Sequence, residues 1–199
     1  WADHRIRARL QPVLDSVASE LGHEIDRIAG EAPDAFRVHA SHGFSIEKLL
    51  EALTSAGQPL ARRYATSTAA AAALRDGQCD ACGIHVPLGP QQGRMLTHLA
   101  QWLHEPDLQV IDIATRRQGL MVAAGNPKKV YELADLVRED LRFINRPAGS
   151  GTRFLLEGLL QDQGIASGAI RGFEQSEDTH AAVAACVASG LADVGFGLE

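Results

Sequence analysis

Apolar residues recur every three or four positions across the first thirty residues of the chain. The recurring positions are Ile6, Leu10, Leu14, Val17, Leu21, Ile25 and Ile28. This period predicts one amphipathic helix over residues 1–30, with a kink or restart at Pro12 and an end at Gly30 and Pro33. The stripe is heptad-like, so we expect it to pair with a second copy of the chain; packing on its own domain is the alternative.

From residue 36 onward, short apolar runs alternate with helical patterns. The apolar runs predict strands at 36–40, 60–65, 81–86, 109–114, 118–123, 141–144 and 192–197. The helical patterns fall at 46–53, 69–74, 94–102, 131–137, 154–160 and 181–188. Strands that alternate with helices in this way are typical of α/β domains built on parallel sheets.

A loop rich in glycine and hydroxyl residues carries the strongest chemical signal. Residues 145–153 read Asn-Arg-Pro-Ala-Gly-Ser-Gly-Thr-Arg and lie between a predicted strand and a predicted helix. The unpaired N–H groups and the dipole at such a helix start favour an anion. Ser150 and Thr152 add hydroxyl donors, and Arg146 or Arg153 adds a charged fork. Helix capping by Ser150 or Thr152 is the alternative, but it accounts for fewer of these residues.

Two further loops repeat the order of strand, hydroxyl-rich loop and helix. One contains Ser41 and His42 after the first strand, and the other contains Ser67 after the second. Helix capping is again the alternative for both loops. His85 lies at the end of the third predicted strand, where open α/β sheets bind ligands, although a single histidine is often structural. Thr179 precedes the last predicted helix and offers one more hydroxyl.

The composition is that of an ordinary globular protein, with 45% hydrophobic and 22% charged residues among 199. The net charge of −6 argues against nucleic-acid binding by this chain itself, and it means that any affinity for an anion comes from local donors. The longest apolar run is too short to span a bilayer, so no membrane association is expected. The absence of a signal peptide favours the cytoplasm, although a mature secreted form would look the same.

The three cysteines, Cys79, Cys82 and Cys186, form no disulfide pattern and favour a reducing compartment. Cys79 and Cys82 make a Cys-x-x-Cys pair followed by His85, which is the pattern of a metal or redox site. The apolar surroundings of Cys82 favour the alternative, a small buried core residue. Because no second Cys-x-x-Cys is present, we expect no metal site.

Residues 143–153 resemble the signature of the periplasmic-binding-protein-like domain that is found fused to helix-turn-helix regulators. Other segments resemble the same family in the same order, namely residues 74–77 with 83–85, residues 117–122 with 125–127, and residues 179–185. Residues 1–30 are similar to the linker helix that follows the winged helix-turn-helix in LysR-type and molybdate-responsive regulators. The DNA-binding domain of such regulators is absent from this sequence.

The resemblance implies an α/β protein with the two-lobed, type II periplasmic-binding-protein-like fold and a ligand cleft between the lobes. A linker and dimerisation helix is then expected at 1–35, a first lobe at 36–115 and a second lobe at 116–199. Family members return to the first lobe with a final strand and helix. This sequence stops at Glu199, soon after the closing strand, so the first lobe is expected to be incomplete.

Three functions follow as hypotheses. The first is the effector domain of a dimeric transcriptional regulator that binds a molybdate- or tungstate-like oxyanion. The resemblance supports this ligand, because related tungstate transporters carry an arginine before a Ser-Gly-Thr loop, and Arg146 occupies that position here. The second is the solute-binding protein of an oxyanion ABC transporter, which the helix at 1–30 disfavours. The third is an enzyme, which we do not expect because no Gly-x-Ser-x-Gly elbow is present. The expected ligand-binding residues are Ser41, His42, Ser67, His85, Arg146, Ser150, Gly151, Thr152 and Thr179, with no cofactor.

Overall fold

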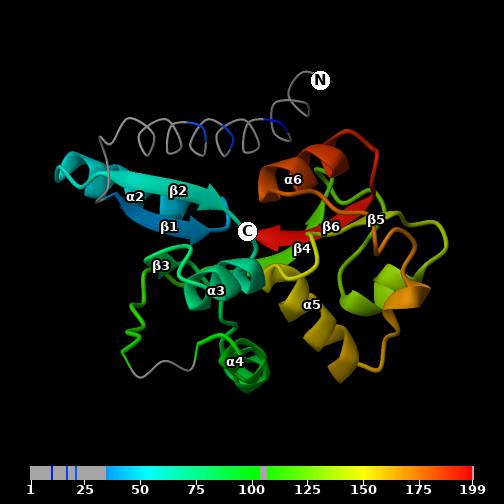
Figure 1. Cartoon of the computed structure of the whole chain (residues 1–199). Helices are drawn as coiled ribbons and strands as arrows, with labels where there is room; N and C mark the ends of the chain where they lie inside the picture. Colours follow the sequence, from blue (N-terminus) through cyan, green and yellow to red (C-terminus); the bar gives the residue numbers. More distant parts are fainter. Residues whose placement is uncertain (1–9, 11–16, 18–20, 22–34, 104–106, 199) are drawn as a thin grey trace. The chain divides into compact units, whose positions relative to one another are not determined.

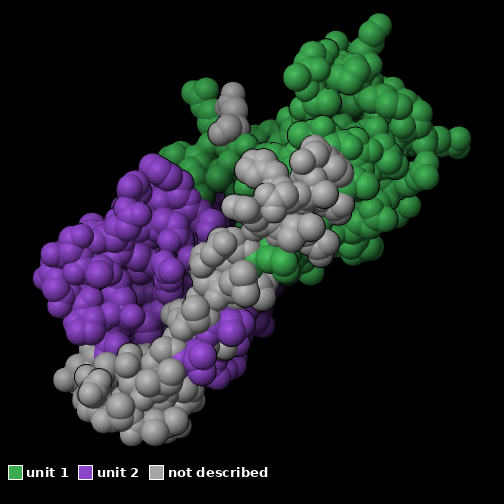
Figure 2. Space-filling view, turned by 90° about the horizontal axis from the view of Figure 1, so that it is seen from above, with its two compact units in different colours: residues 1–10, 115–199 green, residues 11–114 purple. Residues whose placement is uncertain are grey.

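The computed structural model describes residues 10, 17, 21, 35–103 and 107–198. The chain divides into two compact units, one of residues 11–114 and one of residues 115–199 together with 1–10, which Figure 2 colours separately. The helix predicted over residues 1–30 lies outside the described residues except at Leu10, Val17 and Leu21. These three residues are helical, and their exposed fractions are 51%, 56% and 60%.

The unit of residues 11–114 contains a parallel sheet with the strand order β2-β1-β3. The central strand β1 (Phe36–Ala40) pairs along its whole length with β2 (Leu60–Tyr64), whereas β3 (Ala81–Cys82) pairs only with Val38 and His39. Its helices are α2 (Phe44–Ser55), α3 (Ser67–Arg75), the 3-10 helix η1 (Gly89–Gln91) and α4 (Gln92–Ala100) (Figure 1). Because the three strands are parallel, their carboxyl ends meet at one edge of the sheet.

Two strands predicted for this unit differ from the structure. The strand predicted at 81–86 ends at Cys82. The N–H of Gly83 still donates to the carbonyl of His39 at 2.7 Å, but the N–H of His85 donates to a side chain, Ser67 Oγ, at 3.2 Å. The strand predicted at 109–114 is wrong. Val110 and Ile111 are exposed at 87% and 75%, and no described strand pairs with this segment. Strand propensity depends on packing against neighbours, so an apolar run without a partner forms no ladder.

The unit that contains residues 115–199 is built on a second sheet with the order β4-β6-β5. β6 (Val194–Leu198) is central; it runs antiparallel to β4 (Gln118–Val122) and parallel to β5 (Phe143–Ile144). This sheet is therefore mixed rather than parallel throughout. The closing strand predicted from the sequence is its central strand.

Two helices cover the two faces of this second sheet. α5 (Gly151–Asp162) and α6 (His180–Ala188) lie on opposite sides of it (Figure 1). The short elements η2 (Leu133–Val137) and η3 (Ser167–Ala169) are 3-10 helices. The helix predicted at 131–137 is therefore a 3-10 helix over Leu133–Val137 and not an α-helix. None of the helices in the described ranges is long and apolar enough to cross a bilayer.

The alternation of side chains along β5 and β6 divides the core of this unit into two layers. Phe143, Val194 and Phe196 pack with Leu156 and Leu160 of α5. The next residue of β5, Ile144, points to the other face and packs with buried residues of α6, which are Val183, Cys186 and Val187. Successive residues of a strand point to opposite faces, so two neighbouring residues of β5 anchor helices on both sides of the sheet.

Gly195 allows α6 to lie close to the sheet. A Cβ atom at this position would meet Val183 Cγ1 at 2.5 Å and the side chain and carbonyl of Ile144 at 3.3 Å. Real Cβ contacts are not this short, so the absence of a side chain at Gly195 sets the spacing between α6 and β6.

We predict that Gly195→Ala destabilises the protein, because the added methyl group must displace the buried side chain of Val183. Overpacking of this kind costs about 1–3 kcal/mol, which lowers the Tm by roughly 2–10 °C for a chain of this size. Gly119→Ala in the neighbouring strand is the matched control, since a Cβ there meets nothing within 4 Å. Thermal unfolding followed by circular dichroism measures both variants. Equal melting temperatures for the two variants would contradict the packing argument.

Candidate functional site

The loop between β5 and α5 is a tight turn that leads directly into the helix. The N–H of Ser150 donates to the carbonyl of Pro147 at 3.1 Å, and Gly149 between them has a φ of 79°. A positive φ at this position of a turn favours glycine. Ser150 is then the N-cap of α5, because its Oγ accepts a hydrogen bond from the N–H of Arg153 at 3.3 Å. The capping interpretation therefore describes Ser150 in this structure.

Arg146, which precedes this turn, is buried without the partners that a buried charge needs. Only 4% of the residue is exposed, and its Nε and Nη1 atoms have no hydrogen-bond partner in the described structure. Burial lowers the pKa of Arg146 to about 10, while the nearby charge of Asp178 acts in the opposite direction. The side chain is still charged at neutral pH. A buried charge without hydrogen bonds is unfavourable by several kcal/mol, so it requires a special explanation.

Asn145 fixes the backbone from which Arg146 projects. Its side chain accepts from the N–H of Arg146 at 2.9 Å and donates to the carbonyl of Phe173 at 3.1 Å. Its own backbone N–H donates to the carbonyl of Gln175 at 2.8 Å, and its carbonyl accepts from the N–H of Glu177 at 3.0 Å. Asn145 is fully buried. The position of Arg146 is therefore set by a network that does not include its guanidinium group.

Arg153 has the opposite character, although it lies in the same loop sequence. Its guanidinium donates to Glu157 and to Glu174, both at 2.8 Å, and lies 4.9 Å above the ring of Phe173. Burial opposes its charge, but the two carboxylates outweigh that effect and raise the pKa of Arg153. Arg153 is thus committed to contacts within its own unit. Of the two arginines considered as a charged fork, Arg146 is the one whose Nε and Nη1 remain without partners among the described residues.

The start of α6 lies at the same edge of the second sheet. Thr179 is the N-cap of this helix, with its Oγ1 accepting from the N–H of Ala182 at 3.0 Å. His180 Nδ1 accepts from the N–H of Leu198, the last residue of β6, at 3.3 Å. The carboxyl end of β6 is therefore next to the N-terminus of α6. Thr179 acts as a cap here, as the alternative interpretation of such hydroxyls predicts.

Gly151 and Thr152 form the first turn of α5 and are buried. Their backbone N–H groups belong to the helix start, where intrahelical partners are lacking. With Arg146 and Ser150, they are the predicted site residues of the loop between β5 and α5 and the helix start that follows it. The structure holds this group in one loop whose conformation is fixed by Gly149 and Asn145.

In the unit of residues 11–114, three predicted residues come together at the carboxyl edge of the sheet. Ser41 follows β1, Ser67 follows β2 and His85 follows β3. His85 Nδ1 lies 3.3 Å from Ser41 Oγ and 3.5 Å from Ser67 Oγ, and the N–H of His85 donates to Ser67 Oγ. The parallel topology explains this meeting, since strand ends that are far apart in sequence share one edge.

Neither serine of this cluster caps a helix. The N-cap of α2 is Gly43, which provides no side-chain hydrogen bond, and the N-cap of α3 is Thr66. Helix capping therefore does not account for Ser41 or Ser67. The ring centroid of His42 lies 5.0 Å from that of Tyr64.

Sequence reasoning missed Asn145 and Arg116 as parts of these arrangements. Asn145 directly follows β5. A polar asparagine placed right after a predicted buried strand was the signal that the sequence offered. Arg116 stands next to Arg117 in the sequence, and nothing in the sequence distinguishes the two. In the structure Arg116 is half-buried and Arg117 is exposed, and the charge of Arg116 acts on Arg146.

The cysteines have the character of core residues. Cys79 and Cys186 are buried, and none of the three cysteines forms a disulfide. Burial and the neighbouring Cys79 raise the pKa of Cys82 to about 11, so its thiolate is scarce at neutral pH. No group of three or more metal-ligating side chains occurs among the residues that the structure describes.

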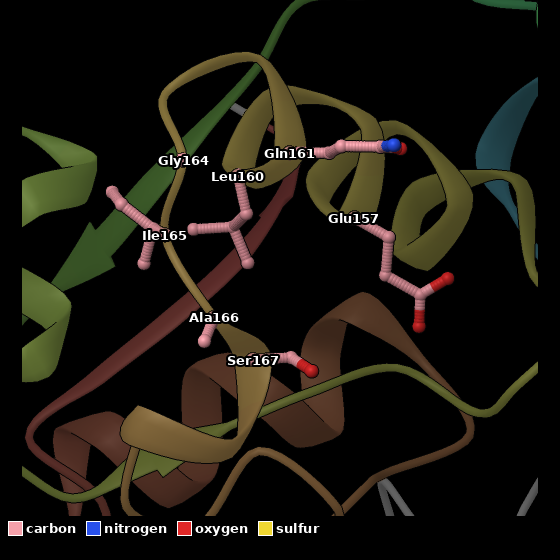
Figure 3. Close-up of a pocket in the computed structure, with 7 residues that line it drawn as sticks. All are labelled: Glu157, Leu160, Gln161, Gly164, Ile165, Ala166 and Ser167. Atoms are coloured by element: carbon pink, nitrogen blue, oxygen red, sulfur yellow. The ribbon is translucent and has the colours of Figure 1, made fainter.

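A cavity of about 340 Å³ lies at the other end of α5 from Arg146. Figure 3 shows Glu157 and Gln161 of the helix on one side and Ala166 and Ser167 of the following loop on the other. None of the predicted site residues lines it. Its rim carries the carboxylate of Glu157, which is unsuited to an anion.

Comparison with known proteins places the chain in a family. A model of the PBP superfamily domain matches residues 50–199. The chain belongs to the PBP superfamily. The periplasmic-binding-protein-like fold implied by the resemblance is thereby confirmed, at the level of the superfamily.

One relative and two solved structures illustrate this membership. The protein YvgK of Bacillus subtilis, described as uncharacterized, is 32% identical over 138 residues, which are 69% of this chain and 45% of YvgK. The chain therefore spans less than half the length of that relative. A putative phosphate ABC transporter substrate-binding protein from Clostridium perfringens, with bound phosphate, has a TM-score of 0.55 at 15% identity, over 83% of this chain and 70% of its own.

The second structure is the ancestral amino-acid-binding protein AncCDT-1, a precursor of cyclohexadienyl dehydratase. It has a TM-score of 0.51 at 16% identity, over 88% of this chain and 74% of its own. At these identities, both structures show that the fold is shared.

Proposed function

We propose that this PBP superfamily domain binds a small oxyanion and that Arg146 is its principal ligand-binding residue. The observation that carries the proposal is the burial of a charged guanidinium whose Nε and Nη1 have no partner in the described structure. A bound oxyanion supplies the missing acceptors and the opposite charge in one group. Charge-assisted hydrogen bonds of this kind are the strong ones in proteins.

The surroundings of Arg146 support an anion rather than a neutral ligand. The loop after Arg146 opens α5, and the edge that it occupies also holds the start of α6. The N-terminus of a helix carries a partial positive charge and donors that point outward. The whole chain has a net charge of −6, so this attraction is local and competes with the general field of the protein.

The unit of residues 11–114 holds a group of donors of its own. Ser41, Ser67 and His85 bring two hydroxyls and one imidazole together within 3.5 Å at a sheet edge. We propose that this group of donors, taken by itself, also suits an oxyanion. A tetrahedral oxyanion has acceptors on every side and accommodates donors from several directions.

We propose that the biological setting is the effector domain of a cytoplasmic transcriptional regulator that senses molybdate or tungstate. The resemblance of residues 1–30 to a regulator's linker helix supports this setting over the alternative, the solute-binding component of an oxyanion ABC transporter. The phosphate-bound protein of similar fold supports oxyanion binding in either setting. No catalytic role is proposed.

Arg146→Met tests the proposed function. Methionine keeps the length of the side chain but removes the donors, and each charge-assisted hydrogen bond contributes roughly 1.5–3 kcal/mol. We expect binding of tungstate to weaken by about ten- to a hundredfold. The Tm without ligand should be unchanged or higher, because a buried charge whose Nε and Nη1 lack hydrogen-bond partners is removed. Isothermal titration calorimetry in a buffer free of phosphate and sulfate, paired with thermal melts, gives both quantities.

Arg153→Met is the matched control for this experiment, because Arg153 is a buried arginine whose guanidinium has partners. It should lower the Tm by roughly 2–8 °C through loss of its ion pairs and its contact with Phe173, while the affinity for tungstate changes little. Full affinity in Arg146→Met, or no tungstate binding by the unaltered protein, would contradict the proposed function.

The dimer proposed for residues 1–30 is tested at two of the described helical positions. Val17→Glu with Leu21→Glu places charges on the exposed apolar stripe, so we expect the dimer to separate into monomers in multi-angle light scattering. Leu96→Glu is the control, because Leu96 on α4 is also half exposed and apolar. A dimer that survives the double substitution would show that this stripe is not the dimer contact.

A further inference from the structure

Arg116 lies at the same edge of the second sheet as Arg146. Gln118, the first residue of β4, is paired with Leu198, the last residue of β6. β5 runs parallel to β6, so the chain that leaves β5 toward Arg146 leaves in the direction of Leu198. Arg116 precedes β4 by two residues and therefore starts from this edge. The two arginines come from opposite sides of the central strand.

The electrostatic effects agree with this placement. The charge of Arg116 disfavours the charge of Arg146 and contributes to its lowered pKa, after the larger effect of burial. Burial also lowers the pKa of Arg116 itself. A buried and a half-buried guanidinium group thus start from one edge of the sheet, and an anion between them offsets both charges.

A carboxylate also acts on the charge of Arg146. Asp178, just before the N-cap of α6, is the carboxylate whose charge favours that of Arg146. Two arginines and one aspartate leave a formal charge of +1 among these three side chains, and the starts of α5 and α6 add roughly half a charge each. The local charge therefore matches a ligand with two negative charges better than a ligand with one.

We propose that Arg116 is a second cationic residue of the anion site and that, with Arg146, it selects doubly charged over singly charged oxyanions. This inference rests on the proposed function and names the class of its ligand. Shape alone cannot make this distinction, because tetrahedral oxyanions of nearly equal size occur with either charge. The positive charge that Arg116 adds to the site provides the discrimination.

Tungstate and perrhenate test the inference, because they are tetrahedral oxyanions of nearly the same size that carry two and one negative charges. The unaltered protein should bind tungstate at least about tenfold more tightly than perrhenate. Arg116→Gln should weaken tungstate binding by about tenfold or more and perrhenate binding by only a few-fold. The ratio of the two dissociation constants, measured by titration calorimetry, should therefore fall.

Two further variants complete the experiment. Arg117→Gln is the matched control, because Arg117 is the exposed neighbour of Arg116; both affinities should stay within about twofold of the unaltered protein. Arg116→Lys keeps the charge but loses the planar fork, so it should lower both affinities and preserve the ratio. If the thermal melt shows that Arg116→Gln does not fold, Arg116→Lys is the variant in which the two affinities are measured.

An unchanged ratio in Arg116→Gln, or a lost ratio in Arg116→Lys, would overturn the inference. If tungstate binding depends on Arg146 but not on Arg116, the charge selection falls and the proposed function stands. If the unaltered protein binds neither anion, or if Arg146→Met binds as tightly as the unaltered protein, the proposed function fails first and the inference falls with it.

Discussion

The guanidinium of Arg146 is charged, almost wholly buried, and has two nitrogen atoms without hydrogen-bond partners in the described structure. Desolvation of a charge is among the largest unfavourable terms in a protein, and it is normally offset by an ion pair or a full set of hydrogen bonds. Arg153, seven residues further along the same motif, has such an ion pair with Glu157 and another with Glu174. The contrast within one motif shows that the chain can satisfy a buried arginine when that residue is structural.

The rest of the unit holds Arg146 in this unfavourable state. Asn145 fixes its backbone, Gly149 makes the turn into α5, and Ser150 caps that helix. The two helices are anchored on opposite faces of the sheet by alternate residues of β5, and Gly195 lets α6 approach closely. Side-chain caps and packing thus stabilise the scaffold, and two of the buried side-chain atoms without a hydrogen-bond partner in the described residues belong to Arg146. This distribution is expected of a binding site that is organised before its ligand arrives.

Much of this arrangement follows from the sequence, and the failures have physical causes. The alternation of apolar runs and helical patterns predicted the α/β class, and the Gly/Ser/Thr loop predicted a helix start with Arg146 beside it. The strand predicted at 109–114 is wrong because β-branched residues favour a strand only where a neighbouring strand pairs with them. None of the described strands pairs with Val110 or Ile111. The roles of Ser150 and Ser67 could not be separated in sequence, since both stand near a helix start. Only the structure shows that Ser150 caps its helix while Thr66 takes that role from Ser67. Arg116 was missed because its place at this sheet edge depends on the pairing of β4 with β6. Its neighbour Arg117 looks the same in the sequence, and only the structure shows that Arg116 is half-buried and Arg117 exposed.

The most direct test of the central claim is to locate the anion. Crystals of the full chain grown with tungstate should give a strong anomalous difference peak near the tungsten absorption edge. The account predicts that this peak lies within hydrogen-bonding distance of the Arg146 guanidinium. A peak elsewhere, for example in the cavity beside Ala166, or crystals without any peak at Arg146 at saturating tungstate, would contradict it.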